Sequence, residues 1–427
     1  MTGEPRIVPG CEVGLVTKFM KSISILGSTG SIGRQTLQVV ESLPERFRVV
    51  ALAAGGNLEE LAGQIARHRP QVVSVSDGAR ATELLERLRQ SGGGAELPEI
   101  QHGGEGLMTV ATHPDAAVVV SAAVGVVGLE ATYAAVQAGK CVALSNKEVL
   151  VAAGSLVMAA ARAKGVELLP VDSEHNAIHQ CLRAGRQCEV RRLVLTASGG
   201  PFRKTPIAQM AQATPEQALA HPNWRMGKRI TIDSATLVNK GFEVIEAHWL
   251  FGIEPKRVDV VIHPQSTVHS MVEYVDGSIL AQLGPTDMRM PIRYALTYPE
   301  REGSNGVELQ WDSFRRLDFE KVPARKFPCL RLARRALEEG GAQPCALNAA
   351  DEVAVEAFLE RRLSFGGIAQ VIERVLNRMP RVALGSIDDV LAADAEARRL
   401  AREEIESVLA AGALVLPGFR AKNGYTS

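Results

Sequence analysis

Two carboxylates two positions apart, Asp172 and Glu174, follow a strand-like apolar run at residues 166–171. Carboxylates at the end of a buried strand need cations or hydrogen bonds, because an unpaired buried charge is very costly. Their oxygen atoms suit a hard divalent metal such as Mg²⁺ or Mn²⁺. The alternative is that Asp172 caps the helix that follows it and that Glu174 is solvated.

A third carboxylate that could join this pair is Glu243. The surrounding pattern predicts a short strand at residues 229–232 and a helix from residue 233 to residue 250. At about 100° per residue, Asn239, Lys240 and Glu243 share one face of that helix. Either this face is solvated and carries a Lys–Glu pair, or Ser234, Asn239 and Lys240 hold a phosphate there and Glu243 binds the metal.

A glycine-rich turn, Gly27-Ser28-Thr29-Gly30-Ser31-Ile32-Gly33, follows the first strand-like run at residues 22–26. Glycines at this spacing bring backbone N–H groups close to a pyrophosphate at a helix N-terminus, although a plain tight turn is the alternative. The second strand, at residues 48–53, ends without the acid that an NAD site uses to bind the ribose. The sequence therefore favours NADP, and Asn57 with nearby backbone N–H groups are the candidate contacts of its 2′-phosphate.

Strand-like and helix-like segments alternate over residues 21–172, which predicts a Rossmann-like, doubly wound α/β sheet. The strand-like runs are mostly continuous and apolar, as in a parallel sheet buried on both faces, and lie at residues 22–26, 48–53, 71–76, 116–122, 140–144 and 166–171. Ser145-Asn146-Lys147-Glu148 and Asp172-Ser173-Glu174 follow the last two runs, at the strand ends where such sheets bind ligands. This placement favours the metal interpretation and puts Lys147 near a substrate oxygen or the cofactor.

Beyond residue 185 the pattern changes to α+β. His175 and His179 lack the glutamate of a zinc-protease helix, so we expect them to be structural. Trp224 stands in a loop, where it is either anchored in a core or forms a lid over a ligand. Strand-like runs at residues 268–274 and 278–283 flank Asp276-Gly277 and predict a hairpin that can extend a sheet or pair with a second subunit. The sequence pattern at residues 298–325 predicts a linker. The region after it shows the residue spacing that is typical of helices.

The composition limits the class of protein. A chain of 427 residues can form two or three domains, and its 48 basic and 48 acidic residues give no general attraction to nucleic acid or to an anionic membrane. The longest apolar run, about 14 residues, is too short to span a bilayer. The six cysteines include no C-x-x-C pair, which favours a reducing cytoplasm. Residues 1–19 show no clear period, and we expect them to lie outside the fold.

Seven ordered motifs together resemble the 1-deoxy-D-xylulose 5-phosphate reductoisomerase family of the non-mevalonate isoprenoid pathway. They are the glycine turn, Ser145-Asn146-Lys147-Glu148, Val171-Asp172-Ser173-Glu174-His175-Asn176-Ala177-Ile178, Ser198-Gly199-Gly200-Pro201-Phe202, His221-Pro222-Asn223-Trp224, Asp233-Ser234-Ala235-Thr236 with Asn239-Lys240-Gly241, and Ile262-His263-Pro264-Gln265-Ser266. The resemblance implies an NADPH-binding domain at residues 20–172, a catalytic and dimerisation domain at 173–297, a linker at 298–325 and a C-terminal helical domain at 326–427.

The resemblance also implies roles for individual residues. Asp172, Glu174 and Glu243 are implied to bind the metal, Mg²⁺ or Mn²⁺. The implied substrate contacts are Lys147, Ser173, Glu174, Ser198, His221, Ser234, Asn239, Lys240 and Glu243, with catalytic roles for Lys147, Glu174, His221 and Trp224. The implied NADPH contacts are Thr29, Gly30, Ser31, Ile32, Gly55, Gly56, Asn57, Asn146, Glu148 and Gly227. One departure is Gly56, where many family members carry a basic or larger polar residue.

The reaction implied by the resemblance starts from a small ketose phosphate. 1-Deoxy-D-xylulose 5-phosphate is rearranged with the help of the metal and reduced by NADPH to 2-C-methyl-D-erythritol 4-phosphate, in a homodimer. Two other classes explain less of the sequence. The first is a semialdehyde or homoserine dehydrogenase. A semialdehyde dehydrogenase needs a nucleophilic cysteine, and none of the six stands in a convincing site. A homoserine dehydrogenase would not explain the set of Asp172, Glu174 and Glu243. The second is a protein that senses a dinucleotide but catalyses no reaction, in which the carboxylates and Lys147 would have no role.

Overall fold

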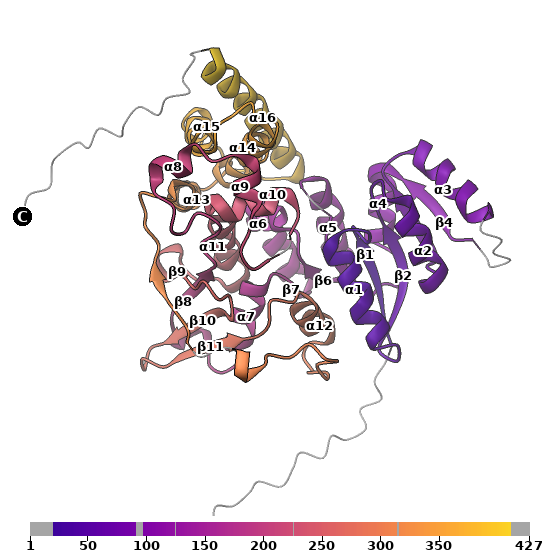
Figure 1. Cartoon of the computed structure of the whole chain (residues 1–427). Helices are drawn as coiled ribbons and strands as arrows, with labels where there is room; N and C mark the ends of the chain where they lie inside the picture. The colour runs from indigo at the N-terminus through magenta and orange to yellow at the C-terminus, as the bar shows by residue number, and fades with distance from the viewer. Residues whose placement is uncertain (1–19, 91–96, 124, 225, 314–315, 411–427) are drawn as a thin grey trace, which may run out of the picture.

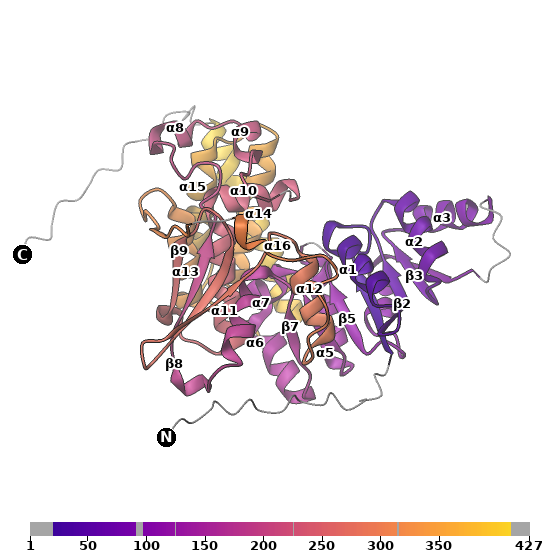
Figure 2. The same ribbon diagram turned by 60° about the horizontal axis from the view of Figure 1, so that its bottom comes forward.

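The computed structural model describes residues 20–90, 97–123, 125–224, 226–313 and 316–410. In Figure 1, strands β1 to β4 and their helices lie at the right, the second sheet lies at the lower left, and helices α14 to α16 lie above it; Figure 2 shows the same division from another side. The expectation for residues 1–19 falls outside the described ranges. No helix within those ranges has both the length and the apolar content that a membrane span requires.

The first sheet is parallel throughout. In the described chain its seven strands have the order β4-β3-β2-β1-β5-β6-β7, so the winding reverses between β1 and β5. The strands are β1 Lys21–Leu26, β2 Phe47–Ala53, β3 Val72–Val75, β4 Glu99–His102, β5 Val118–Ser121, β6 Cys141–Leu144 and β7 Leu168–Pro170. The helices between them are α1 Ser31–Ser42, α2 Leu58–His68, α3 Gly78–Gln90, α4 Gly103–Ala111, α5 Val127–Gln137 and α6 Lys147–Lys164. The predicted doubly wound sheet is confirmed.

The edge strand β4 is the element of this sheet that the sequence pattern does not predict. Its sequence, Glu-Ile-Gln-His, contains a single apolar residue, and among the described strands it pairs with β3 alone. An edge strand keeps one side open to water and therefore tolerates polar residues. The central strands β3 and β5 are instead buried at every position, which is why their apolar runs are visible in the sequence.

The second sheet is mixed. Its five strands in the described ranges have the order β11-β10-β8-β9-β12, with β8 parallel to β9 and the other pairs antiparallel. They are β8 Val190–Ala197, β9 Val258–Ile262, β10 Val268–Tyr274, β11 Ile279–Leu283 and β12 Glu320–Lys321. Strands β10 and β11 form the predicted hairpin, whose turn uses Gly277 at a φ of 86°. Strand β11 is an edge of the sheet, and Ile279 on it is 54% exposed.

The remaining helices pack around α6 and the second sheet. They are α7 Ser173–Leu182, α8 Ile207–Ala211, α9 Pro215–Leu219, α10 Lys228–Thr236, α11 Val238–Phe251, α12 Arg289–Thr297, α13 Pro328–Glu339, α14 Gln343–Leu359, α15 Phe365–Arg378 and α16 Ile387–Ala410, with single 3₁₀ turns at Gln187–Glu189, Pro255–Arg257 and Trp311–Ser313. Helix α14 packs against α15, α16 and α6. One continuous hydrophobic core joins one face of the first sheet to α11 and to the C-terminal helices.

The strand predicted at residues 229–232 is wrong. These residues belong to helix α10, and the chain turns through Leu237, at a φ of 59°, before α11 begins. The β-branched run Ile-Thr-Ile favours a strand by propensity, but Thr231 and Ile232 are buried where α10 packs on α9, α11 and α14. Tertiary packing therefore decides the local structure here.

Helices α6 and α11, which carry residues of the site described below, pack closely against each other at Gly154. Next to it, Ala153 leaves helical geometry at φ −134° and ψ 24°. A Cβ atom on Gly154 would lie 2.3 Å from Cδ1 of Trp249 on α11. Only a residue without a side chain fits between the α6 backbone and this rigid indole ring.

We predict that Gly154→Ala lowers the free energy of unfolding by about 1–3 kcal/mol, because the added methyl group overpacks the contact with Trp249. Gly63→Ala is the matched control, since Gly63 is an exposed helical residue whose added Cβ would meet nothing within 4 Å. It should raise stability by about 0.5–1 kcal/mol through helix propensity. Unfolding in urea measures both changes, and a stable Gly154→Ala protein would show that α6 and α11 do not depend on this close approach.

Candidate active site

A cavity of about 540 Å³ opens at the carboxyl edge of the first sheet, bounded by α10, α11 and the second sheet. It collects predicted residues that lie far apart in the sequence. The predicted residues that line it are Ser31, Ile32, Lys147, Asp172, Ser173, Glu174, Ser198, His221, Trp224, Gly227, Ser234, Asn239, Lys240 and Glu243. The predicted metal and substrate residues are therefore brought together in one place.

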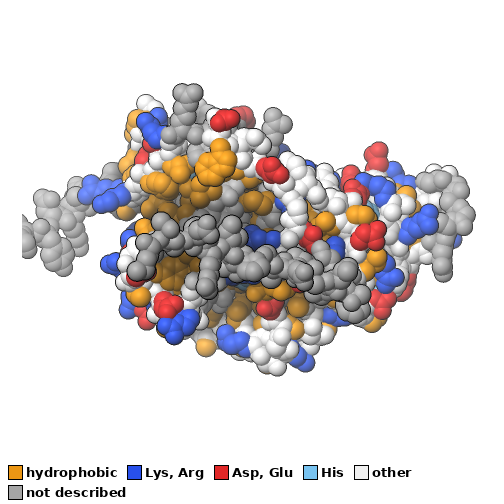
Figure 3. All heavy atoms as spheres, turned by 90° about the horizontal axis from the view of Figure 1, so that it is seen from below, with side chains coloured by type: hydrophobic (Ala, Val, Ile, Leu, Met, Phe, Trp, Pro, Cys, Tyr) orange, Lys and Arg blue, Asp and Glu red, His pale blue; other side chains and the backbone are white. Residues whose placement is uncertain are grey.

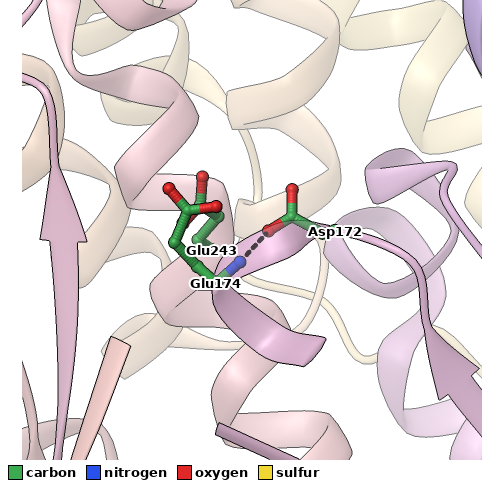
Figure 4. Close-up of side chains that lie close together, drawn as sticks. All are labelled: Asp172, Glu174 and Glu243. Carbon is green, nitrogen blue, oxygen red and sulfur yellow. Dashed lines mark hydrogen bonds between the residues drawn. The ribbon is translucent and has the colours of Figure 1, made fainter. Parts of the chain in front are cut away.

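The three predicted metal ligands converge. Asp172 is the N-cap of α7 and accepts a hydrogen bond from the backbone N–H of Glu174 at 3.2 Å, while Glu243 projects from α11 (Figure 4). Among the described residues they form the one group of potential metal ligands, with one oxygen from each lying within 4.8 Å of the others. Asp172 thus caps α7, as the alternative interpretation of its role expected, and it also belongs to the group of three carboxylates.

Two lysines neutralise part of this group. Lys147, at the start of α6, contacts Asp172 and lies 3.6 Å from Glu243, and Lys240 donates to Glu174 at 2.8 Å and also contacts Glu243. The solvated-face alternative for α11 is wrong, because Lys240 is 3% exposed and Glu243 is 1% exposed. Both side chains face the cavity instead of bulk water.

The cluster contains an excess of carboxyl groups that a bound cation would balance. Burial raises the pKa of Glu243 to about 8, and nearby Glu174 adds to the shift. Burial also raises the pKa of Glu246, whose carboxyl group lies 3.8 Å from Lys147. Burial alone would raise the pKa of Asp172 as well, but the adjacent ammonium group of Lys147 lowers it overall. The cluster holds more carboxyl groups than ammonium groups, so the donor set fits a hard divalent ion.

The two histidines of α7 do not line the cavity. The Nε2 atom of His175 lies 2.8 Å from the backbone oxygen of Glu243, and the Nδ1 atom of His179 lies 2.8 Å from the hydroxyl of Tyr294. Burial lowers the pKa of each imidazole to about 4, so both are neutral. Their expected structural role is confirmed, and His175 fixes the backbone that carries Glu243.

The loop from His221 to Trp224 is held over the cavity by hydrogen bonds. The Nδ1 atom of His221 accepts from the backbone N–H groups of Asn223 at 3.2 Å and Trp224 at 3.0 Å. The proton of the neutral imidazole therefore lies on Nε2, which donates to the Ser198 hydroxyl at 3.0 Å. Burial lowers the pKa of His221, which favours this neutral form. Trp224 is half-buried and lines the cavity, so the core-anchor alternative is wrong.

The glycine turn on the cofactor side has the predicted geometry. Gly27 has a φ of 86°, and a Cβ atom there would lie 2.5 Å from the backbone oxygen of Ala122. Ser31 and Ile32 begin α1 and reach the cavity. The remaining predicted contacts of this edge lie outside the cavity lining and are Thr29, Gly30, Gly55, Gly56 and Asn57. The bare backbone of the turn fits a pyrophosphate.

Two predicted cofactor contacts have structural partners. The Asn146 side chain caps α6 by accepting from Glu148 N at 3.0 Å and donates to the Gly125 oxygen at 3.0 Å. The Glu148 carboxylate accepts from Arg229 of α10 at 2.7 Å. Neither residue lines the cavity, and Gly227 is the predicted NADPH contact that reaches it from the other side.

Several lining residues were missed by sequence reasoning. They are Gln35, Thr196, Met226, Ile230, His269, Thr286, Asp287 and Met288. His269 donates a hydrogen bond from Nε2 to the Pro285 oxygen at 3.2 Å, and its ring centroid lies 6.5 Å from that of Trp224. No local pattern around residues 286–288 marks a site, because only the fold of the hairpin brings that segment to the cavity.

The glycine-turn sheet and the three-carboxylate group, opening into one cavity, define the class of metal-assisted dinucleotide oxidoreductases. Three family models match the chain: 1-deoxy-D-xylulose 5-phosphate reductoisomerase at residues 23–154, its C-terminal domain at residues 168–251, and a DXP reductoisomerase C-terminal domain at residues 283–400. The chain belongs to the 1-deoxy-D-xylulose 5-phosphate reductoisomerase family.

Individual relatives agree with this assignment. The chain is similar to 1-deoxy-D-xylulose 5-phosphate reductoisomerases of Solibacter usitatus, at 54% identity over 90% of this chain and 97% of the relative, and of Ectopseudomonas mendocina, at 52% over 90% and 98%. Among solved structures it is similar to the Zymomonas mobilis enzyme in complex with NADPH, with a TM-score of 0.85, 43% identity and coverage of 91% and 100%. It is also similar to a DOX-P reductoisomerase in complex with NADPH, fosmidomycin and magnesium, with a TM-score of 0.86, 39% identity and coverage of 92% and 99%.

We predict that Glu243→Gln weakens Mn²⁺ binding at least about tenfold, because glutamine, unlike Glu243, cannot lose a proton to become an anionic ligand when the metal binds. Glu246→Gln on the same helix is the matched control, since its carboxyl group faces Lys147 and His175 and does not belong to the group of three. It should change Mn²⁺ affinity less than about twofold, because its carboxyl group supplies no oxygen to the group of three. Titration calorimetry measures both affinities, and equal losses would point to disturbed packing instead of ligation.

Proposed function

We propose that this chain converts 1-deoxy-D-xylulose 5-phosphate into 2-C-methyl-D-erythritol 4-phosphate, using NADPH and a divalent metal. The observation that carries the proposal is that a metal-type carboxylate group and a dinucleotide turn open into the same cavity. Membership of a family named for this reaction supports it. The complexes of relatives with NADPH and magnesium support the choice of cofactors.

The oxygens of Asp172, Glu174 and Glu243 are proposed to hold Mg²⁺ or Mn²⁺. When bound, the metal supplies Lewis-acid stabilisation of negative charge on the substrate's carbonyl and hydroxyl oxygens, and NADPH supplies the hydride. Lys147 and Lys240 stand at the same carboxylates and are proposed to orient substrate oxygens next to the cation. Their pKa values are raised by these carboxylates against the effect of burial, so both remain charged.

The phosphate of the substrate is proposed to bind in the same cavity, beside the carboxylate group. Hydroxyl, amide and imidazole groups there face the same space, and they are Ser173, Ser198, His221, Ser234 and Asn239. Because the Ser198 oxygen accepts a hydrogen bond from His221, its own hydroxyl hydrogen can be donated to a phosphate oxygen. Binding energy gained at the phosphate, remote from the reacting carbons, can be used to orient them.

Trp224 is proposed to cover the bound substrate and exclude water. Its backbone is fixed through His221, and the neighbouring Asn223 donates to the Pro264 oxygen at 2.6 Å and to the Ser266 hydroxyl at 3.0 Å. A ring held at the mouth of a site in this way can shield reactive groups without a large movement of the backbone. Lys147, Glu174, His221 and Trp224 together form the proposed catalytic set.

The cofactor is proposed to lie along the carboxyl edge of the first sheet. Its reduced ring would face the cavity near Ser31, Ile32 and Gly227, and its adenosine end would lie near Gly55, Gly56 and Asn57. Thr29 and Gly30 would face the pyrophosphate, and Asn146 and Glu148 would brace the neighbouring loop. We propose residues 20–172 as the NADPH-binding domain, 173–297 as the catalytic and dimerisation domain, 298–325 as a linker and 326–427 as the C-terminal helical domain.

We also propose that the enzyme is a homodimer joined through β11 and works in the cytoplasm. Ile279 and Leu280 on this edge strand are 54% and 38% exposed, and an unpaired apolar edge is a template for pairing with another strand. Seen from below in Figure 3, hydrophobic side chains gather at the left of the molecule, the side that holds the second sheet in Figure 1. The five cysteines that the structure describes are free, which fits a reducing compartment.

The proposed reaction predicts that purified protein oxidises NADPH when both 1-deoxy-D-xylulose 5-phosphate and Mg²⁺ or Mn²⁺ are present. EDTA should remove the activity, and readdition of the metal should restore it, because the cation is needed at the three carboxylates. The loss of NADPH absorbance measures the rate. If folded protein that binds NADPH shows no oxidation with either metal, the proposed function is wrong.

The proposed dimer predicts that Ile279→Lys yields a monomer, because a charge on the edge strand opposes strand pairing. Val275→Lys is the control, since Val275 is 65% exposed but stands in the turn before β11. Sedimentation velocity should give dimers for the parent chain and for Val275→Lys. A parent chain that sediments as a monomer would refute the dimer.

A further inference from the structure

A guanidinium group lies beside the turn that follows β2. Arg80 is in the first turn of α3, and β3, which precedes α3, is the neighbour of β2 in the sheet. A Cβ atom built on Gly56 would lie 3.2 Å from Nε and 3.3 Å from Nη2 of Arg80. The guanidinium group therefore occupies the space that a side chain at position 56 would fill.

Hydrogen bonds of Nη1, on the side of the guanidinium group away from Gly56, fix its orientation. Nη1 donates to Asp77 Oδ2 at 2.6 Å and to the Ser76 hydroxyl at 2.9 Å, and Asp77 Oδ1 accepts from the Arg80 backbone N–H at 2.9 Å. The hydrogen bond from the Arg80 backbone, followed by that from Ser76, lowers the pKa of Asp77 to about 2. Asp77 is therefore ionised at any physiological pH and continues to accept the hydrogen bond from Nη1.

The Nε–Nη2 edge of Arg80 is the edge nearest Gly56, and no hydrogen-bond partner is found for it among the described residues. Two parallel N–H groups at this edge match two oxygens of a phosphate. The Arg80 side chain is 46% exposed, so an anion can reach it from solvent.

We propose that Arg80 binds the 2′-phosphate of NADPH and thereby selects NADPH over NADH. In a sheet of this type the adenosine ribose lies at the end of β2, where an acid binds the 2′-hydroxyl of NAD or a nearby arginine accepts the 2′-phosphate of NADP. β2 ends in Ala53-Ala54-Gly55-Gly56, which offers neither side chain. Arg80 supplies the arginine from the next crossover, and Gly56 leaves the room for it. This inference rests on the proposed use of NADPH.

The test is equilibrium binding of NADPH and of NADH to the full chain, measured by titration calorimetry without substrate or metal. Arg80→Ala should weaken NADPH binding at least about tenfold, the scale of losing hydrogen bonds to a charged group, and change NADH binding less than about twofold. Arg87→Ala is the matched control, because Arg87 lies on the same helix and pairs with Glu83. It should leave both affinities unchanged.

The outcomes separate this inference from the proposed function. If the parent chain prefers NADPH and Arg80→Ala keeps the full preference, the 2′-phosphate is bound elsewhere and this inference alone is overturned. Equal losses for NADPH and NADH overturn it too, since Arg80 would then act on the fold of the turn. If the parent chain binds no NADPH, the proposed function fails together with this inference.

Discussion

The structure depends on a set of buried charges that must neutralise one another. Asp172 and Glu174 enter from the end of β7, Glu243 enters from α11, and Lys147 and Lys240 stand between them. Separating any of these groups would leave an unpaired charge in a largely buried position, which costs several kcal/mol. The ends of β6 and β7 and the start of α11 are therefore tied to one another by electrostatics as well as by packing.

Contacts of the backbone fix the positions of these charged side chains. The close approach of α6 and α11 at Gly154 places the start of α6, with Lys147, beside α11. The left-handed residue Leu237 separates α10 from α11, so that Ser234 and Glu243 face one cavity from two helices. His175 then fixes the Glu243 carbonyl. A metal site needs its ligands held to within fractions of an ångström, and rigid elements provide this better than loops.

The parts of the site that the sequence predicts are those encoded locally. The glycine turn, the Asp172–Glu174 pair and the β10–β11 hairpin each rest on a few consecutive residues whose chemistry allows few conformations. The sequence does not reveal the edge strand β4, which lacks an apolar run, or the helical state of residues 229–232, which is imposed by packing. Nor does it show that Lys240 turns inward to two glutamates, because helical spacing alone describes a solvated pair equally well.

The cofactor edge shows the same limit in another form. A search for an acid or an arginine directly after β2 finds nothing, yet the fold brings Arg80 to that point from the crossover after β3. Parallel strands place all their following loops along one edge, so a binding group can come from any neighbouring strand without changing its position in space. The proposed phosphate recognition at the adenosine end thus rests on different elements from those that carry Asp172, Glu174 and Glu243. The specificity of the adenosine end can therefore change without disturbing the buried charges around Glu243.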